Sequence, residues 1–320
     1  MAQIGSDIKY VIELLNRQEL VGIPTETVYG LAGNAFDANA VAKIFKVKDR
    51  PSFDPLIVHT SGFERIHEFV DEIPDKARAL ANNFWPGPLT MIFKKKTIIP
   101  DLVTSGLETV AVRIPNHPFT LKLLESIDFP LAAPSANPFG YVSPTKAEHV
   151  NEQLGEKIPY ILDGGDCHVG IESTIISFEK GDATVLRIGG CKIESIEKVI
   201  GKVLLKPHAN SNPIAPGMMD SHYAPITPIK IGDINKMMHK YDGENIGILS
   251  FDKYYEMVSE SHQFVLSEKS DLNEAATRLF TGLRHLDALN LQLILSEYVP
   301  DEALGRAIND RLKRAEAKRN

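Results

Sequence analysis

The chain has 320 residues, of which 43% are hydrophobic and 24% are charged, and its formal net charge at pH 7 is −7. This composition predicts a soluble protein that buries one large core and a smaller second one, and the acidic balance argues against broad binding of polyanions. No apolar run approaches the roughly 18–20 residues of a membrane span, and the first residues lack a basic segment followed by an apolar core, so we expect no membrane association and a cytoplasmic location.

The two cysteines, Cys167 and Cys191, have no partners at short spacing. Zinc modules and disulfide frameworks need several cysteines at regular intervals. The cysteine pattern therefore argues against both, and each cysteine can serve as a small buried apolar residue.

The first segment with ligand-binding character is residues 24–31, which read Pro-Thr-Glu-Thr-Val-Tyr-Gly-Leu. They follow the apolar run 20–23, and Pro24 ends this predicted strand because proline has no N–H for the ladder. Thr25 and Thr27 supply hydroxyl groups that can bind a ligand. Taken alone, the segment also fits an ordinary polar loop between a strand and a helix.

Two cations follow the next predicted helix. Lys48 and Arg50 stand at the end of an amphipathic pattern, and Pro51 displaces Arg50 from helical geometry, so that its guanidinium can bind phosphate. The alternative is a cationic last turn that complements the helix dipole. Residues 55–58 then predict a buried strand that ends at His59, where a structural role is the commoner one.

Further helices are predicted at residues 6–17 and 61–70. The second begins at Ser61, and Glu64 three positions later completes a capping box. Short strands lie between these helices, and the mixture indicates an α/β domain with a mixed sheet.

The strand predicted at residues 108–114 alternates in polarity, so Thr109, Ala111 and Arg113 share one face. An arginine on such a face requires an anion. Residues 131–138 form a strand of small residues that ends at a proline, a pattern that suits a nucleotide better than a core. Further polar and cationic candidates stand in this segment and beside later predicted strands: Ser135, Asn137, Ser143, Ser173 and Arg187.

From residue 226 onwards, strands and helices alternate and the strands are continuously apolar, which predicts a small parallel α/β domain. Residues 272–289 carry apolar side chains at helical spacing and predict a core helix. The tail 305–320 is rich in arginine and lysine, and we interpret it as a solvated helix end, with contact to RNA or a partner as the alternative. The segment has no phosphate-binding motif, so we assign it no chemistry of its own.

The order of these motifs is more informative than any one of them. PTETVYGL, K-x-R followed by PLIVH, TVAVRIP, APSAN, EST and LRIG occur in that order, and residues 8–200 thereby resemble the Sua5/YrdC/YciO family of threonylcarbamoyl-AMP synthases. Residues 216–225 are similar to the linker of the long, Sua5-type members. Without the resemblance, the same stretch is a proline-rich connector between domains.

The resemblance implies three regions. Residues 1–207 would form a YrdC-like domain, in which a twisted mixed sheet and its helices surround a concave basic pocket. Residues 208–225 would be a linker that folds over the pocket as a lid, and residues 226–320 a small C-terminal Sua5 domain of the parallel, Rossmann-like type.

The implied activity is condensation of L-threonine, bicarbonate and ATP into threonylcarbamoyl-AMP and pyrophosphate, for the t6A modification of tRNA. Mg²⁺ would accompany ATP, and tRNA and the threonylcarbamoyl transferase complex are possible partners. By the same resemblance, five residues would bind L-threonine: Thr27, His59, Arg113, Ala133 and Ser173. Eight would bind ATP: Lys48, Arg50, Thr109, Ser135, Asn137, Ser143, Arg187 and Tyr223.

Lys48 and Arg50 are the implied catalytic residues, because they would stabilise charge on the departing pyrophosphate. The family pattern also brings Ser221 and His222 of the linker over the nucleotide. Asp54 departs from the residues usual at its position, and an acid beside a triphosphate would repel it unless Mg²⁺ or a lysine intervenes. We therefore expect no direct contact of Asp54 with ATP, a metal-linked role is the alternative for it, and the metal ligands stay unassigned.

Two other functions are compatible with parts of the pattern. One is a protein that binds double-stranded RNA or tRNA through the same basic pocket, which would show salt-dependent binding. The other is a carbamoyl transferase of the hydrogenase-maturation type, but those proteins carry a cysteine-rich zinc region that two cysteines cannot build.

Overall fold

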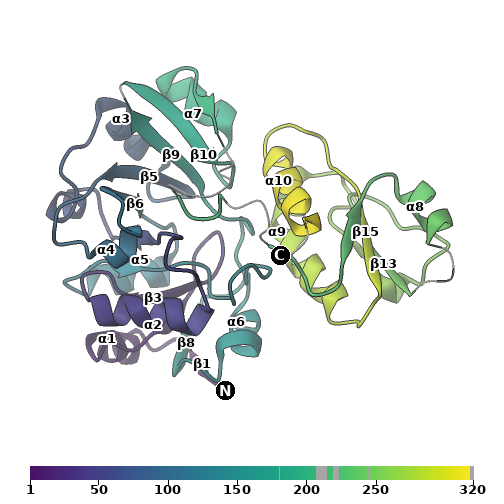
Figure 1. Ribbon diagram of the computed structural model, residues 1–320, viewed down its shortest axis with the longest axis horizontal. Helices are drawn as coiled ribbons and strands as arrows, with labels where there is room; N and C mark the ends of the chain where they lie inside the picture. Colours follow the sequence, from purple (N-terminus) through teal and green to yellow (C-terminus); the bar gives the residue numbers. More distant parts are fainter. Residues whose placement is uncertain (180, 207–214, 219–222, 242, 244, 318–320) are drawn as a thin grey trace.

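The computed structural model describes residues 1–179, 181–206, 215–218, 223–241, 243 and 245–317, and these residues form two sheets. Figure 1 shows a larger part that contains the N-terminus beside a smaller part built by the last third of the chain. The predicted linker, residues 208–225, lies between them in sequence, and Ser221 and His222 fall outside the described residues.

The larger part holds an eleven-stranded sheet with the order β1-β8-β2-β3-β7-β4-β6-β5-β9-β10-β11. Its strands are β1 (Gln3–Gly5), β2 (Val21–Ile23), β3 (Gly30–Asn34), β4 (Ile57–His59), β5 (Leu89–Lys94), β6 (Thr109–Arg113), β7 (Leu131–Ala132), β8 (Tyr160–Leu162), β9 (Thr174–Glu179), β10 (Asp182–Arg187) and β11 (Leu204–Leu205). Its helices are α1 (Ile8–Asn16), α2 (Ala38–Lys48), the 3₁₀-helix η1 (Glu64–Glu68), α3 (Asp75–Phe84), α4 (Asp101–Thr104), α5 (Pro118–Glu125), α6 (Ala147–Leu154) and α7 (Ile193–Ile200).

The centre of this sheet mixes both strand directions. β4 and β6 are parallel, β6 and β5 antiparallel, β5 and β9 parallel, and β9 and β10 antiparallel. The mixed sheet predicted from the sequence is thereby confirmed.

Helix α2 ends at Lys48, the first of the two cations. Asp37 caps the first turn of α2 by accepting hydrogen bonds from the backbone of Asn39 and Ala40, and Asp49 adopts a left-handed conformation with φ 52° immediately after Lys48. This termination directs the next residues away from the helix axis and towards β4.

The predicted helix at residues 61–70 is wrong in its extent. The structure has only the five-residue η1, which begins after Phe63 without a side-chain cap. Gly62 separates Ser61 from this turn, and because glycine disfavours helix initiation, Ser61 stays outside and cannot complete the capping box.

The smaller part is a parallel α/β domain, as predicted. Its sheet has the order β12-β15-β13-β14, and all three strand pairs are parallel. The strands are β12 (Ile229–Ile231), β13 (Ile246–Ser250), β14 (Gln263–Val265) and β15 (Leu293–Ser296), and the helices are α8 (Ile234–Lys240), η2 (Glu260–His262), α9 (Leu272–Asp287) and α10 (Gly305–Glu316).

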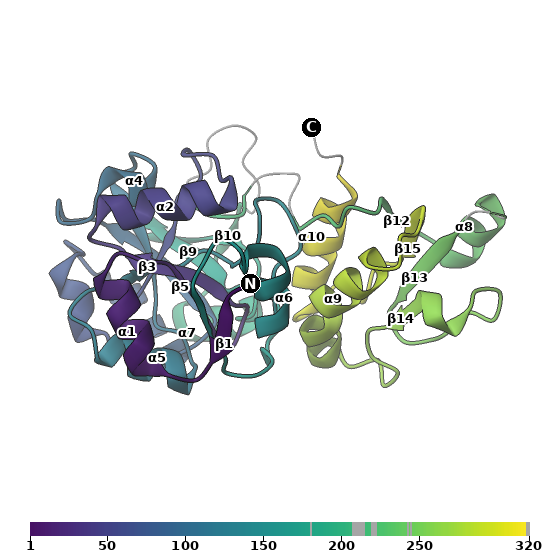
Figure 2. The same cartoon turned by 90° about the horizontal axis from the view of Figure 1, so that it is seen from below.

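Helices α9 and α10 face the larger part, whereas α8 lies on the opposite side of the small sheet (Figures 1 and 2). One hydrophobic cluster joins the two parts, because Val28 and Val142 of the larger part belong to the same buried group as Leu279 and Phe280 of α9. No helix among the described residues combines the length and the apolar character needed to cross a membrane.

The solvated helix end expected at residues 305–320 is wrong for its central arginines. Arg311 and Arg314 on α10 are 0% and 1% exposed. Both guanidinium groups lie over the ring of Tyr223, at 4.8 and 4.9 Å from its centroid. Arg311 and Arg314 therefore make contacts inside the protein and are not available to solvent or to a partner.

Candidate active site

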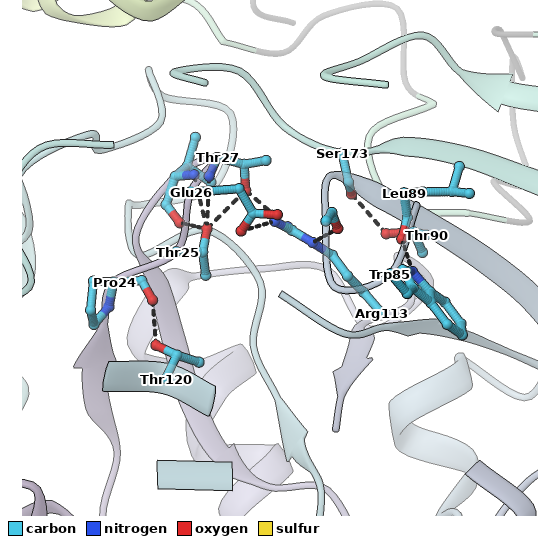
Figure 3. A network of polar contacts seen from close by, with 12 residues as sticks. Pro24, Thr25, Glu26, Thr27, Trp85, Leu89, Thr90, Arg113, Thr120 and Ser173 are labelled. Atoms are coloured by element: carbon cyan, nitrogen blue, oxygen red, sulfur yellow. Dashed lines mark hydrogen bonds and ion pairs between the residues drawn. The ribbon is translucent and has the colours of Figure 1, made fainter. Parts of the chain in front are cut away.

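The loop after β2 is organised by Thr25. Its hydroxyl oxygen accepts from the backbone N–H groups of Thr27 and Val28 at 3.1 and 3.2 Å and donates to the Val28 carbonyl at 2.6 Å. The hydroxyl of Thr120 on α5 donates to the carbonyl of Pro24 and fixes the start of the turn (Figure 3). The turn thereby presents Thr27 to the neighbouring strand β6.

Arg113, at the end of β6, receives three protein contacts. Its Nη1 donates to Thr27 Oγ1 at 2.8 Å, its Nε donates to the Gly87 carbonyl at 3.2 Å, and its Nη2 forms an ion pair with Glu26 Oε2 at 2.7 Å (Figure 3). Arg113 and Glu26 are 3% and 1% exposed. The anion expected beside Arg113 is therefore present within the protein as Glu26.

A cavity of about 50 Å³ lies in front of Arg113. The turn after β2, the ends of β4 and β10 and the loop after β7 all contribute to its wall. Nine of the predicted site residues line the cavity: Thr27, Arg50, His59, Arg113, Ala133, Ser135, Ser173, Arg187 and Tyr223. Motifs that are distant in sequence thus meet at one place.

His59 lines the cavity from the end of β4 and is 3% exposed. Burial, with a contribution from the charge of Arg113, lowers the pKa of His59 to about 3. The imidazole is therefore neutral at pH 7 and can exchange hydrogen bonds with a ligand without carrying a charge.

Arg50 lines the same cavity and is held by the loop that follows it. Its Nη2 lies 2.9 Å from Asp54 Oδ2, and its guanidinium also donates to the carbonyls of Asp54 and Pro55 at 3.0 and 2.8 Å. Asp54 is fully buried and does not line the cavity. Its carboxylate thus has a role as counter-charge of Arg50, and this role requires no metal.

Lys48 does not line the cavity. Its ammonium group donates to the carbonyl of Ser135 at 2.5 Å and to that of Asn137, and the Asn137 amide in turn donates to the carbonyls of Pro138 and Tyr141 at 2.8 and 3.0 Å. Burial and the nearby Arg50 lower the pKa of Lys48. Lys48 and Asn137 therefore fix the loop that places Ser135 on the cavity.

Ser173 and Arg187 form the wall on the side of β9 and β10. The Arg187 guanidinium donates to the carbonyl and to the hydroxyl of Ser173, both at 3.0 Å, and to the carbonyl of Pro216 at 3.3 Å. The Ser173 and Thr90 hydroxyls share a hydrogen bond of 2.7 Å (Figure 3). Arg187 therefore connects Ser173, directly before β9, with Pro216 in the described part of the linker.

Glu172 and Tyr223 complete this wall. Glu172 Oε1 accepts from the hydroxyl of Ser143 at 2.5 Å, and Oε2 accepts from Arg311 Nε at 3.0 Å. Ser143 is fully buried behind Glu172. Tyr223 has a left-handed backbone with φ 65° and stacks on Phe280 with a centroid separation of 5.7 Å.

Thr109 lies apart from the other predicted ATP residues. It lines a second cavity of about 750 Å³, together with Ile92, Ser177 and Leu186. An apolar cluster contains Ile92 and Leu186 as well as Ile57 of the first cavity, with Ala215 and Met218 packed against them. The two cavities thus share one apolar sheet face.

Sequence reasoning missed the two carboxylates of the site, Glu26 and Glu172. Glu26 stands between Thr25 and Thr27 in the first motif, and Glu172 directly precedes Ser173. An acid within a turn that also has buried neighbours must pair with a cation. The need of a buried acid for a cationic partner could have pointed to Glu26 and Glu172 in the sequence, but it does not identify the cation.

Comparison with known families covers nearly the whole chain. Residues 13–189 match the family model Sua5_yciO_yrdC, which is described as telomere recombination. Residues 191–317 match the model of the C-terminal domain of threonylcarbamoyl-AMP synthase.

Individual relatives agree with these matches. Threonylcarbamoyl-AMP synthase of Pyrococcus abyssi is 40% identical over 96% of this chain and 93% of its own length, and that of Bacillus subtilis is 40% identical over 94% and 90%. The crystal structure of P. abyssi Sua5 complexed with L-threonine superposes with a TM-score of 0.91 at 38% identity, over 98% of this chain and 97% of that one. E. coli YciO, at 22% identity and a TM-score of 0.52, shares the fold of 59% of the chain.

Proposed function

Because this chain belongs to the Sua5/YrdC/YciO family and has the two-domain form of its Sua5 members, we propose that it synthesises threonylcarbamoyl-AMP from L-threonine, bicarbonate and ATP and releases pyrophosphate. The observation that carries the proposal is one cavity lined by Arg50, Arg113 and Arg187 together with threonine and serine hydroxyls. Three buried arginines around a cavity provide sites for a carboxylate and for phosphates.

The threonine end of the site is Arg113. Each of its terminal nitrogens keeps a second N–H after the contacts with Thr27 and Glu26, and a carboxylate can bind two such donors at once. His59 and Ser173 lie on the same cavity and offer neutral hydrogen-bonding groups to the substrate hydroxyl or the carbamate. Ala133 leaves room beside them because its side chain is a methyl group.

The position proposed for ATP follows from the geometry of strand β6. Thr109 and Arg113 share a face, and four residues of strand separate them by about 13 Å. ATP therefore extends from the arginine cluster along the apolar face towards Thr109, where the second cavity offers the space that the first lacks. The triphosphate lies near Arg50 and Arg187, with Ser135 as an additional donor.

The proposed chemistry needs no covalent enzyme intermediate. The threonine amine attacks the carbon of bicarbonate, and a C–O bond of bicarbonate breaks with release of water to give the carbamate. A carbamate oxygen then attacks the α-phosphorus, and the bond from this phosphorus to the bridging oxygen of pyrophosphate breaks. Arg50 and Arg187 stabilise the charge on the departing group. Burial raises the pKa of Cys167, and that of Cys191 to about 12, so neither thiol is an activated nucleophile.

The described part of the chain offers no dedicated ligand set for the Mg²⁺ expected with ATP. Among the described residues, no group of three or more His, Cys, Asp and Glu side chains could hold a metal, and Asp54 and Glu172 are paired with arginines. The ion would neutralise phosphate charge and would be held by the phosphates and water, as is usual for Mg²⁺.

The RNA-binding alternative gains no support from the site. Lys48, Arg50, Arg113 and Arg187 are at most 9% exposed, so these cations cannot track a polynucleotide backbone. We propose instead that tRNA meets the product through the threonylcarbamoyl transferase complex, which would place the protein in the cytoplasm with these partners.

The proposed function is tested by pyrophosphate release from ATP, with L-threonine, bicarbonate or Mg²⁺ omitted in turn. We expect release only when all are present and its loss in Arg113→Ala. Arg113→Lys keeps the charge but loses the bidentate fork, so it should raise the KM for threonine more than that for ATP. Release that is indifferent to threonine or bicarbonate would refute the proposal.

A further inference from the structure

The last helix of the C-terminal domain reaches the wall of the catalytic cavity through one side chain. Arg311 on α10 is fully buried and donates from Nε to Glu172 Oε2 at 3.0 Å and from Nη1 to the Ile188 carbonyl at 2.9 Å. Its Nη1 also lies 2.7 Å from Asp310 Oδ2. The guanidinium therefore connects α10 with the segments on both sides of β9 and β10.

Glu172 connects this contact to the cavity. It is 6% exposed and lines the cavity together with Arg187 and Tyr223. Arg311 lies over the Tyr223 ring as well, at 4.8 Å from the centroid. Arg311 thus holds two residues of the cavity wall: Glu172 through an ion pair and Tyr223 through a cation–π contact.

A carboxylate in the wall of an anion-binding cavity needs a counter-charge. The buried position weakens solvent screening, so an unpaired Glu172 would repel a phosphate strongly. Arg311 supplies the opposite charge at hydrogen-bonding distance. It also orients the carboxylate so that Oε1 accepts from Ser143.

We propose that Arg311 is a positioning residue for ATP: it cancels the charge of Glu172 and holds Glu172 and Tyr223 in the wall, so that nucleotide affinity depends on the C-terminal domain. The inference rests on the proposed function only in taking ATP as the anion. It gives the C-terminal domain a direct part in the site.

The test is a double-mutant cycle on ATP binding, measured by equilibrium dialysis with labelled ATP and Mg²⁺ on the full chain. Its variants are Arg311→Gln, Glu172→Gln and the double variant. The matched control is Arg306→Gln, because Arg306 lies on the same helix and pairs with Glu194 of α7 at 3.1 Å, but this pair is partly exposed and away from the cavity. Thermal unfolding of each variant identifies any that fails to fold.

We expect Arg311→Gln to weaken ATP binding by about tenfold or more, because it leaves a buried carboxylate beside the phosphates. The double variant should recover most of this loss, and Arg306→Gln should bind like the wild type. In turnover assays, the KM for ATP should rise in Arg311→Gln while that for threonine changes less than about twofold.

Equal loss of ATP binding in Arg311→Gln and in the double variant would overturn the inference, because a merely structural role predicts no recovery. An unchanged affinity in a folded Arg311→Gln would overturn it as well. If ATP binds and the cycle behaves as expected while no threonine-dependent pyrophosphate appears, the proposed function fails and the inference about Arg311 stands.

Discussion

At the scale of single residues, the site is a set of buried cations that are each held by a carboxylate or by carbonyl groups. Arg50 has Asp54, Arg113 has Glu26, and Lys48 has the carbonyls of the loop after β7. Such pairs contribute little net stability relative to apolar residues, but loss of one partner is costly because the other charge stays buried. Their value lies in holding donors ready for an anionic substrate.

Asp54→Asn tests how costly it is to remove one partner of the buried Arg50–Asp54 ion pair. The variant should lose about 3 kcal/mol of unfolding free energy, since the Arg50 charge stays buried without its partner. Urea denaturation measures the loss. The control is Asp49→Asn, whose pair with Lys157 at 3.5 Å is exposed and whose loss should cost less than about 1 kcal/mol. Equal losses of unfolding free energy in the two variants would show that burial does not make the Arg50–Asp54 pair costlier to break than an exposed pair.

His59 predicts a dependence of stability on pH. Its pKa is about 3 in the folded protein against 6.5 for the free group, so the unfolded chain binds an extra proton between these values and stability rises with pH across this window. At pH 5 the penalty from His59 is about 2 kcal/mol relative to pH 7.5. His59→Gln should flatten the curve between pH 5 and 6.5, and an unchanged slope would show that His59 is not held neutral.

At the scale of elements, two helices of the C-terminal domain hold loops of the catalytic domain. Arg284 on α9 donates to the carbonyls of Val142 and Ser143 at 2.5 and 3.3 Å and to the Gln153 side chain at 2.9 Å. The loop held in this way follows the one that Lys48 fixes, so α9 supports the cavity from behind.

Arg284→Met should therefore lower the unfolding free energy by about 2–4 kcal/mol, because buried carbonyls lose their donors. Arg278→Met on the same helix removes a partly exposed pair with Glu274 and should cost less than about 1 kcal/mol. Guanidinium denaturation of both variants checks the contrast, and equal midpoints would mean that α9 does not anchor the loop.

Local patterns predicted the elements that carry the site. The alternation in β6 placed Thr109 and Arg113 on one face, and the end of α2 placed Lys48 and Arg50, because periodicity and helix termination are set by neighbouring residues. The ion pairs between residues distant in sequence were not predictable. Arg311 is 139 positions from Glu172, and only the folded chain decides which buried acid meets which buried base.

At the scale of the whole molecule, the two parts share a buried cluster that includes residues of both. We expect them to unfold in a single transition. The only tryptophan in the sequence, Trp85, lies between α3 and β5, so its fluorescence reports on the larger part, whereas far-ultraviolet circular dichroism reports on both. Coincident denaturation curves are the predicted result, and two separated midpoints would show that the shared cluster does not couple the parts.

Synthesis of threonylcarbamoyl-AMP requires that bicarbonate carbon, threonine and adenylate meet in one product. The most direct measurement is mass spectrometry of the nucleotides formed from ATP, L-threonine and ¹³C-bicarbonate with Mg²⁺. We predict a threonylcarbamoyl-adenylate that carries a single ¹³C atom and is absent without threonine or with Arg113→Ala. An adenylate without the label, or no threonine-dependent product from protein that binds ATP, would contradict it.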